Sequence, residues 1–220
     1  MKDIYSNHKD FWTKDNIFSL GSSLLLLIIA LFIQKASDIY IRSIQSQAVG
    51  DILLNNIPVW DIDGIIILST LLFTATIVCL LITRPRYVLF TIKSIALFVI
   101  IRAFFISLTH LGVNPHEIVF DPGNIGFWFY DFLYNTKNDF FFSGHTGLPF
   151  LMALIFYNDS FWRKVFFTTS LVFGISVIIA HMHYSIDVFA APFITYSIYT
   201  IAEKIFKKDR MLINSILAKN

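Results

Sequence analysis

Six apolar stretches divide this chain of 220 residues, and each is close to the length that a helix needs to cross a bilayer. A membrane-spanning helix takes ~20 predominantly apolar residues. Hydrophobic residues make up 56% of the sequence and charged residues 15%, a balance too apolar for a soluble domain. The sequence therefore predicts an all-α polytopic membrane protein, a bundle of six transmembrane helices in a single domain over residues 1–220. The stretches occupy about residues 17–34, 64–82, 87–108, 143–158, 165–183 and 184–202.

Lysine and arginine residues are spread unevenly over the two ends of the predicted bundle. The end with both termini holds most of them, whereas the opposite end holds Lys35, Arg42 and Lys137. Because Lys and Arg collect in cytoplasmic loops, we expect both termini in the cytoplasm and the opposite end on the outer face. The short chain, rich in Ile, Asn and Phe and without appended domains, indicates a bacterial inner membrane.

Several classes of function are disfavoured by the composition. Cys79 is the only cysteine, which excludes an intramolecular disulfide and a cysteine-based metal cluster. The net charge of +2 and the scattered basic residues argue against a nucleic-acid partner. His110 and His116 share a loop but lack the spacing of a metal site. We expect no cofactor and no metal, and the lipid bilayer as the main partner.

Polar residues from distant parts of the sequence converge on the predicted outer end. Arg102 lies near the outer end of the third stretch, the segment "NDFFFSGHT" opens the fourth, and "HMHYSIDV" joins the fifth to the sixth. Ionisable residues within membrane segments are functional candidates by default. The topology thus predicts one polar layer at the outer mouth of the bundle, made of Arg102, His145, His183 and Asp187, with Ser143, Gly144 and Thr146 beside His145 in the first turn of the fourth stretch.

The residue types in this layer suit the handling of a phosphate ester. The start of a helix offers unpaired N–H groups and a positive dipole end, and Gly144 allows an anion to approach the backbone. Arg102 adds a planar fork of donors for two phosphate oxygens. Asp187 lies four residues after His183, so its carboxylate can orient that imidazole as a nucleophile. His145, on another helix, can then protonate the departing oxygen.

The segments "FFSGHT" and "AHMHYSIDV" resemble the type 2 phosphatidic acid phosphatase (PAP2) superfamily, and most closely its sphingomyelin synthase-like branch. The resemblance covers about residues 102–200, within a catalytic core of about 87–202. It implies six transmembrane helices, a site on the exoplasmic face and metal-free chemistry. It also implies that His183 forms a phosphohistidine, that Asp187 orients it, and that His145 is the acid for the leaving group.

Departures from the superfamily's phosphatases favour the synthase-like branch. Those phosphatases show "KxxxxxxRP", "PSGH" and "SRxxxxxHxxxD" segments. In this chain Ile77 stands at the lysine position, Phe142 at the proline, and Val177 at the phosphate-binding arginine. We therefore expect a transferase that moves a phosphoryl headgroup from a phospholipid donor to a lipid hydroxyl, on ceramide or diacylglycerol.

Three alternatives to the transferase fit the sequence to different degrees. A lipid phosphate phosphatase would use the same residues with water as acceptor. A non-enzymatic lipid-binding or scramblase-like protein is disfavoured, because it would have no reason to keep the two histidines and the aspartate together. A histidine-ligated membrane oxidase would need repeated histidine clusters, which the sequence lacks.

Further polar residues are weaker candidates. Asp139 could bind a cationic headgroup or tune the acid, and is equally well explained as a solvated loop carboxylate. His181 and Tyr184 are expected to support His183 or contact the headgroup. The aromatic run over residues 127–142 could form a cation–π box for choline, but such runs more often anchor a loop in the headgroup layer.

Overall fold

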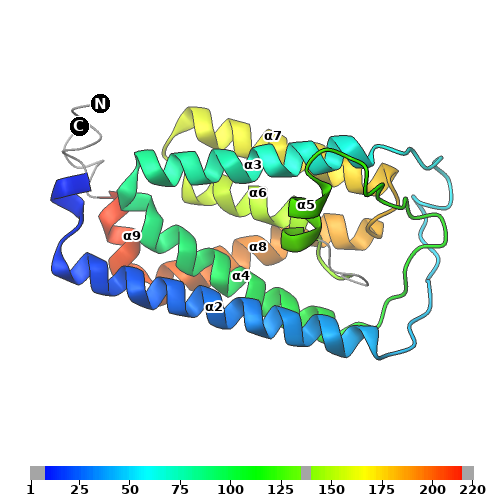
Figure 1. The fold of residues 1–220 in the computed structure, drawn as a ribbon, viewed down its shortest axis with the longest axis horizontal. Coiled ribbons are helices and arrows are strands. Elements are labelled where there is room, and N and C mark those ends of the chain that lie inside the picture. Colours follow the sequence, from blue (N-terminus) through cyan, green and yellow to red (C-terminus); the bar gives the residue numbers. More distant parts are fainter. Residues whose placement is uncertain (1–7, 135–139, 215–220) are drawn as a thin grey trace.

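Five long helices run side by side along one axis in the computed structural model, which describes residues 8–134 and 140–214 (Figure 1). They are α2 (Lys14–Arg42), α3 (Asp63–Thr83), α4 (Val88–Leu108), α7 (Ser160–Ile179) and α8 (Ser185–Ile205). The shorter helices are η1 (Pro85–Tyr87), α5 (Phe127–Tyr134), α6 (Gly144–Ile155) and α9 (Lys207–Asn214). The all-α prediction is confirmed for the residues that the structure describes.

The five long helices are each long and apolar enough to cross a membrane, which supports an integral membrane protein. The predicted sixth span, over residues 143–158, is shorter than expected. Its helix, α6, has 12 residues, and at 1.5 Å per residue these reach only ~18 Å, short of the ~30 Å hydrocarbon core. The N-cap of the helix is Ser143 and its C-cap is Phe156. The chain turns at both residues, so the helix is shorter than the apolar stretch. The prediction of six full spans is therefore not confirmed.

Helix α2 extends two turns beyond the apolar stretch that predicted it. The extension carries three charged residues, and their charges are paired: Asp38 contacts Arg42 at 2.9 Å and Lys35 at 3.6 Å. Pairs three and four residues apart lie on one face of a helix and stabilise it. Apolarity alone underestimates the length of α2 for this reason.

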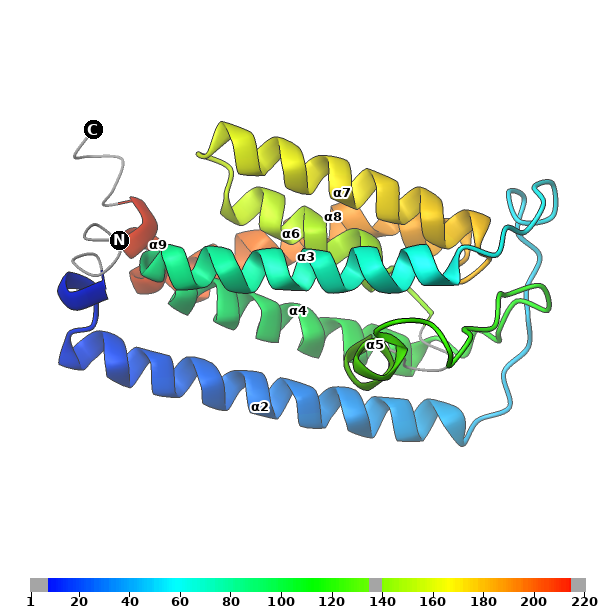
Figure 2. The same ribbon diagram turned by 45° about the horizontal axis from the view of Figure 1, so that its top comes forward.

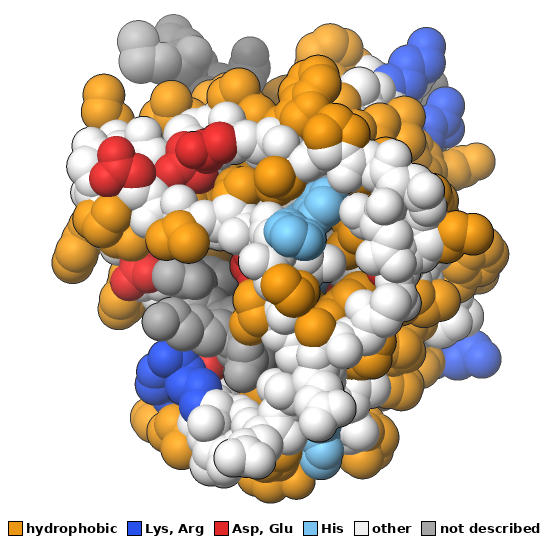
Figure 3. Space-filling model, turned by 90° about the vertical axis from the view of Figure 1, so that its right-hand side faces the viewer, with side chains coloured by type: hydrophobic (Ala, Val, Ile, Leu, Met, Phe, Trp, Pro, Cys, Tyr) orange, Lys and Arg blue, Asp and Glu red, His pale blue; other side chains and the backbone are white. Residues whose placement is uncertain are grey.

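One end of the bundle, here called the loop end, is where α7 ends and α8 begins (Figure 2). Residues 43–62 and 109–126 connect helices there. Trp60 N–H donates to the carbonyl of Ile179 at 2.9 Å, and Ile118 N–H donates to that of Ala180 at 3.2 Å. Since the last carbonyls of a helix lack partners within it, these bonds fix both connections over the end of α7. Figure 3 looks onto the loop end, where acidic and basic side chains gather on different parts of the face.

At the opposite end α9 is tied to the bundle by a buried ion pair. Lys93 Nζ lies 2.7 Å from Asp209 Oδ2 and donates to Ser19 Oγ at 2.9 Å. Ser19 Oγ in turn donates to Asp209 Oδ1 at 2.9 Å. Lys93 therefore joins α2, α4 and α9, which accounts for a lysine inside an apolar stretch without a role at the loop end.

Asp51 links the first connection to the start of α8 across 134 positions of sequence. Its Oδ2 accepts from Ser185 N–H at 2.7 Å and from Ser185 Oγ at 2.8 Å. Its Oδ1 accepts from the N–H groups of Leu53 at 2.8 Å and Leu54 at 3.1 Å. Burial alone would raise the pKa of the Asp51 carboxyl, but these hydrogen bonds hold it below its ordinary value. The residue acts as a cap for α8 supplied from a distant loop.

Replacing Asp51 with Ala should destabilise the loop end, because four donors lose their charged acceptor. Losing hydrogen bonds to a charged group costs ~1.5–3 kcal/mol, so we expect a clear fall in the melting temperature of the detergent-solubilised protein. Asp61→Ala is the matched control, since Asp61 is an exposed aspartate on the same connection. A melting temperature equally low in both variants would contradict a specific capping role.

Candidate functional site

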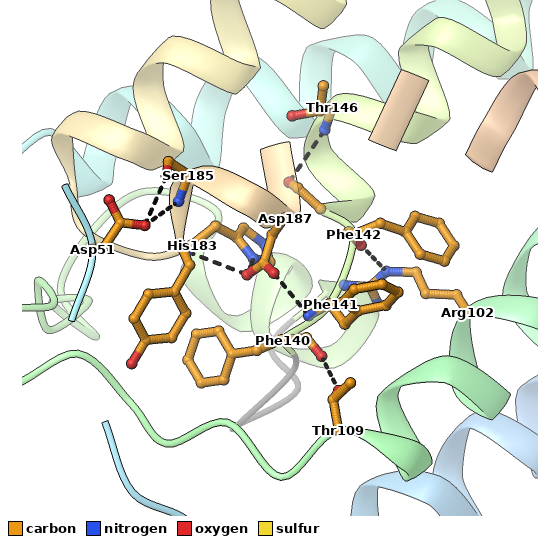
Figure 4. A network of polar contacts seen from close by, with 12 residues as sticks. Asp51, Arg102, Thr109, Phe140, Phe141, Phe142, Thr146, His183, Ser185 and Asp187 are labelled. Atoms are coloured by element: carbon orange, nitrogen blue, oxygen red, sulfur yellow. Dashed lines mark hydrogen bonds and ion pairs between the residues drawn. The ribbon is translucent and has the colours of Figure 1, made fainter. Parts of the chain in front are cut away.

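His183 and Asp187 lie together at the start of α8, as the sequence predicted. The His183 Nδ1 atom is 3.4 Å from Asp187 Oδ2, and both side chains are buried, with 6% and 0% of their surface exposed (Figure 4). The helix begins at Ser185, so His183 sits in the turn before it rather than in its first turn. The same carboxylate oxygen accepts from Tyr184 N–H at 3.2 Å. Asp187 thus caps its own helix while it faces the imidazole.

Asp187 also fixes the segment that leads into α6. Its Oδ1 accepts from Phe141 N–H at 3.2 Å, and its backbone carbonyl accepts from Ser143 N–H at 2.9 Å. Phe141 and Phe142 have φ angles of 93° and 36°, in the left-handed region that strains residues with a Cβ. Proline fixes φ near −65° and could not occupy position 142 in this conformation. A proline at position 142 would therefore require a different backbone before α6.

Arg102 lies against the first turn of α6. Its Nε donates to the carbonyl of Phe142 at 3.1 Å, and only 8% of the residue is exposed. A Cβ placed on Gly144 would lie 3.3 Å from both Cζ and Nε of Arg102. Glycine at 144 thus lets the guanidinium approach the helix start, where Ser143 Oγ accepts from Thr146 N–H at 3.4 Å. A cation and a positive helix end meet here, which favours a bound anion.

His145 extends from the same turn toward His183. The two imidazole centroids are 6.3 Å apart, and their planes cross at 62°. The Tyr130 hydroxyl is 3.2 Å from His145 Nε2, and the ring of Tyr134 is 6.3 Å from that of His145. Both tyrosines come from α5, which therefore helps to fix the orientation of His145. The two predicted histidines are therefore close enough for both to contact one small group placed between them.

Tyr130 is a neighbour that sequence reasoning missed. It belongs to the aromatic run interpreted as an interfacial belt or a choline box, but its side chain is buried. The signal was present in the spacing, because Tyr130 and Tyr134 are one helical turn apart and so share a face. For Asp51, no pattern in the neighbouring sequence predicts its contact with Ser185.

The remaining predicted residues lie in different surroundings. Thr146 is buried and faces α7, since a Cβ on Gly174 would lie 3.2 Å from its hydroxyl. Tyr184 is buried and donates to the carbonyl of Gly112 at 2.8 Å, so it anchors the second connection. His181 is buried in the α7–α8 turn, and desolvation lowers the pKa of its imidazole. Asp139 lies outside the described residues.

An apolar cavity of about 420 Å³ adjoins the site between α2, α3, α4 and α6. Arg102, Gly144 and His145 form part of its lining. Within the described part of the chain, no group of three His, Cys, Asp or Glu side chains is placed to hold a metal ion. The arrangement offers a cation at a helix start and two imidazoles beside a largely apolar cavity.

Replacing Gly144 with Ala tests the close approach of Arg102. Alanine at an open helical position usually stabilises relative to glycine by ~0.5–1 kcal/mol. At position 144 the new Cβ would press on a buried guanidinium that is already held by Phe142, so we expect a lower melting temperature. Gly21→Ala is the control, because nothing lies within 4 Å of a Cβ built there. A rise in melting temperature for both variants would contradict the predicted contact.

Comparison with known families matches the segment that contains this geometry. The model of the PAP2 superfamily C-terminal region matches residues 137–204, which include α6, α7 and α8 and make up roughly a third of the chain. No curated protein and no solved structure matches the chain. Members of the superfamily are phosphoryl-transfer enzymes. Over residues 137–204, the segment that contains the two histidines and the aspartate, this chain is therefore similar to the PAP2 superfamily.

Proposed function

We propose that this chain is a single-domain membrane enzyme that moves a phosphoryl headgroup between lipids through a phosphohistidine. The observation that carries the proposal is the pairing of buried His183 with Asp187, with His145 facing it at a centroid distance of 6.3 Å. Arg102 and the first turn of α6 border the same space. The family match supports the general class of reaction, a phosphoryl transfer on a lipid.

In the first half of the reaction, His183 is the nucleophile. When its Nδ1 carries the proton, that proton points to Asp187 Oδ2, and the lone pair on Nε2 is available to attack. Attack forms the N–P bond and breaks the P–O bond to the donor lipid's alcohol. His145, as the imidazolium, gives its proton to the departing oxygen. The 3.4 Å separation of His183 and Asp187 is long for a hydrogen bond, and such contacts often tighten once substrate is bound.

In the second half, a lipid hydroxyl accepts the group. Neutral His145 takes the hydroxyl proton, the oxygen attacks phosphorus, and the N–P bond breaks to regenerate His183. Charge on the phosphate oxygens is stabilised by Arg102 and by the N–H groups at the start of α6. Ceramide or diacylglycerol is the expected acceptor.

We place the site on the outer face of the membrane and both chain termini in the cytoplasm. The starts of α2 and α9 lie at the end of the bundle opposite to the site (Figure 1). That end also carries Arg84, Arg163 and Lys204, in keeping with the preference of basic residues for the cytoplasm. A bacterial inner membrane fits this arrangement.

A lipid phosphate phosphatase is the second candidate, with water in place of the lipid hydroxyl. The surroundings of Val177 favour the transferase. This residue stands where the phosphatases carry an arginine, and it is buried in an apolar cluster with Ile66, Ile67 and Tyr130. A guanidinium there would lose its solvation without a described partner. Arg102, from α4, supplies the cation instead.

Product analysis separates the two candidates. Purified protein is incubated with labelled phosphatidylcholine, phosphatidylethanolamine or phosphatidic acid, with and without ceramide or diacylglycerol. We expect transfer of the headgroup to the added acceptor, because an apolar chamber beside the site excludes water. Release of inorganic phosphate from phosphatidic acid, independent of acceptor, would show a phosphatase. No product with any pair would contradict both candidates.

Replacing His183 with Ala should reduce turnover by at least ~10³-fold, as expected for loss of a nucleophile. It should also abolish the acid-labile phosphoprotein that accumulates when a labelled donor is supplied without acceptor. His116→Ala is the control, because His116 is an exposed histidine at the same end of the bundle and should keep both signals. A His183→Ala protein that still forms the phosphoprotein would assign the nucleophile to another residue.

A further inference from the structure

The cavity beside the site is polar at one end and apolar below it. Arg102, Gly144 and His145 line the polar end, and Thr70 adds a buried hydroxyl with no hydrogen-bond partner among the described residues. Thr70 lies seven residues from the start of α3 and Arg102 six residues from the end of α4, so both lie ~10 Å from the loop end. The remaining lining from α3 and α4 is mostly apolar. A cavity that is polar at one end and apolar along the rest of its length suits an amphiphilic ligand.

The cavity is lined by the faces of α3 and α4 that would normally pack against a neighbouring helix. The lining positions recur every three or four residues, the period of one face of a helix. On α4 they include Ile95, Phe98, Val99 and Arg102. On α3 they are Thr70, Phe73, Thr74, Ile77, Val78 and Leu81. These stripes border an open volume, so a ligand rather than a helix is the natural occupant.

The cavity is about as long as half the thickness of a bilayer core. The α3 stripe runs from Thr70 to Leu81, a rise of ~16 Å, which is about half of the ~30 Å hydrocarbon core. On α4 the deepest lining residue, Ile95, lies two turns below Arg102. A lipid with its phosphate at Arg102 would therefore extend its chain along α3 and α4, away from the loop end.

The cavity also opens sideways toward the region where lipid would lie. Leu31 of α2 and Val78 of α3 both line it, yet they keep 53% and 50% of their surfaces exposed. Residues that border a closed chamber would be buried. The opening between these helices gives a hydrocarbon chain a route from the bilayer that never crosses water.

We propose that the cavity holds a hydrocarbon chain of the substrate lipid, and that its floor on α4, at Ile95, sets the chain length the enzyme prefers. The inference rests on the proposed function, because it takes the phosphate of that lipid to lie between Arg102 and His145. Binding is driven by removal of the chain's apolar surface from water or detergent, because the lining below Thr70 is mostly apolar. Chain length is then selected by the volume above the floor.

The test compares a dihexanoyl with a dipalmitoyl donor in mixed micelles. Ile95→Trp raises the floor, so we expect kcat/KM for the long-chain donor to fall at least about tenfold, the effect of losing two buried methylene groups. The value for the short-chain donor should change less than twofold. Ile175→Trp is the matched control, because Ile175 is exposed on α7 and does not line the cavity. An unchanged ratio of the two donors in Ile95→Trp would overturn the inference.

A second measurement uses the unaltered protein, in case Ile95→Trp does not fold. A phospholipid with a diazirine at the end of one chain is activated by light, and the labelled peptides are identified by mass spectrometry. We expect labels on the lower part of α3 and α4, lost when unlabelled dipalmitoyl lipid is added in excess. Labels only on exposed helix surfaces, insensitive to competition, would overturn the inference. Absence of turnover with every donor would instead contradict the proposed function, while the labelling still tests the cavity.

Discussion

The buried carboxylate of Asp187 is the interaction on which the site depends. One side chain faces the imidazole of His183, caps α8 through Tyr184, and accepts from Phe141 in the strained segment before α6. A carboxylate with none of its surface exposed is costly unless its oxygens are bonded, and here each oxygen has a backbone donor. The hydrogen bonds that offset the cost of burying this carboxylate also set the distance between α6 and α8. Local backbone geometry and the chemistry of the candidate nucleophile are thus fixed by one residue.

The membrane setting explains why the polar groups gather in a single layer. Along most of their length the helices present apolar faces, and a charge there would need a partner inside the bundle. Lys93 has such a partner in Asp209. Arg102 lies closer to the loop end, where the carbonyl of Phe142 and the start of α6 provide polar surroundings. The start of α6 fits the same constraint, because its first turn lies at the depth of Arg102 and carries His145.

The part of the site that could be predicted from sequence is the part that is local. His183 and Asp187 are four residues apart, and a helix start brings them together whatever the rest of the chain does. Arg102 stood out because it is an ion inside an apolar stretch. The bond from Asp51 to Ser185 joins residues 134 positions apart, and no local pattern announces it. The left-handed backbone at Phe141 and Phe142 could not be predicted from the sequence either. It arises where the segment is held by hydrogen bonds to Asp187 on one side and to Arg102 on the other. Five of the six helices followed from apolarity, and the sixth was overestimated because burial among helices looks the same in sequence as burial in lipid.

The choice between a lipid hydroxyl and water as acceptor depends on what surrounds the proposed phosphohistidine. Imidazole chemistry is the same for both, so the acceptor is set by which molecule reaches phosphorus. The cavity lined by α2, α3 and α4 meets the site at His145, the residue proposed to deprotonate the acceptor. An acceptor that enters by this route comes from the bilayer with its hydroxyl leading, and it displaces water as it comes. The apolar surroundings of Val177 close a further approach for a solvated group. Under the proposed function, this access from the bilayer favours a lipid hydroxyl over water as the acceptor.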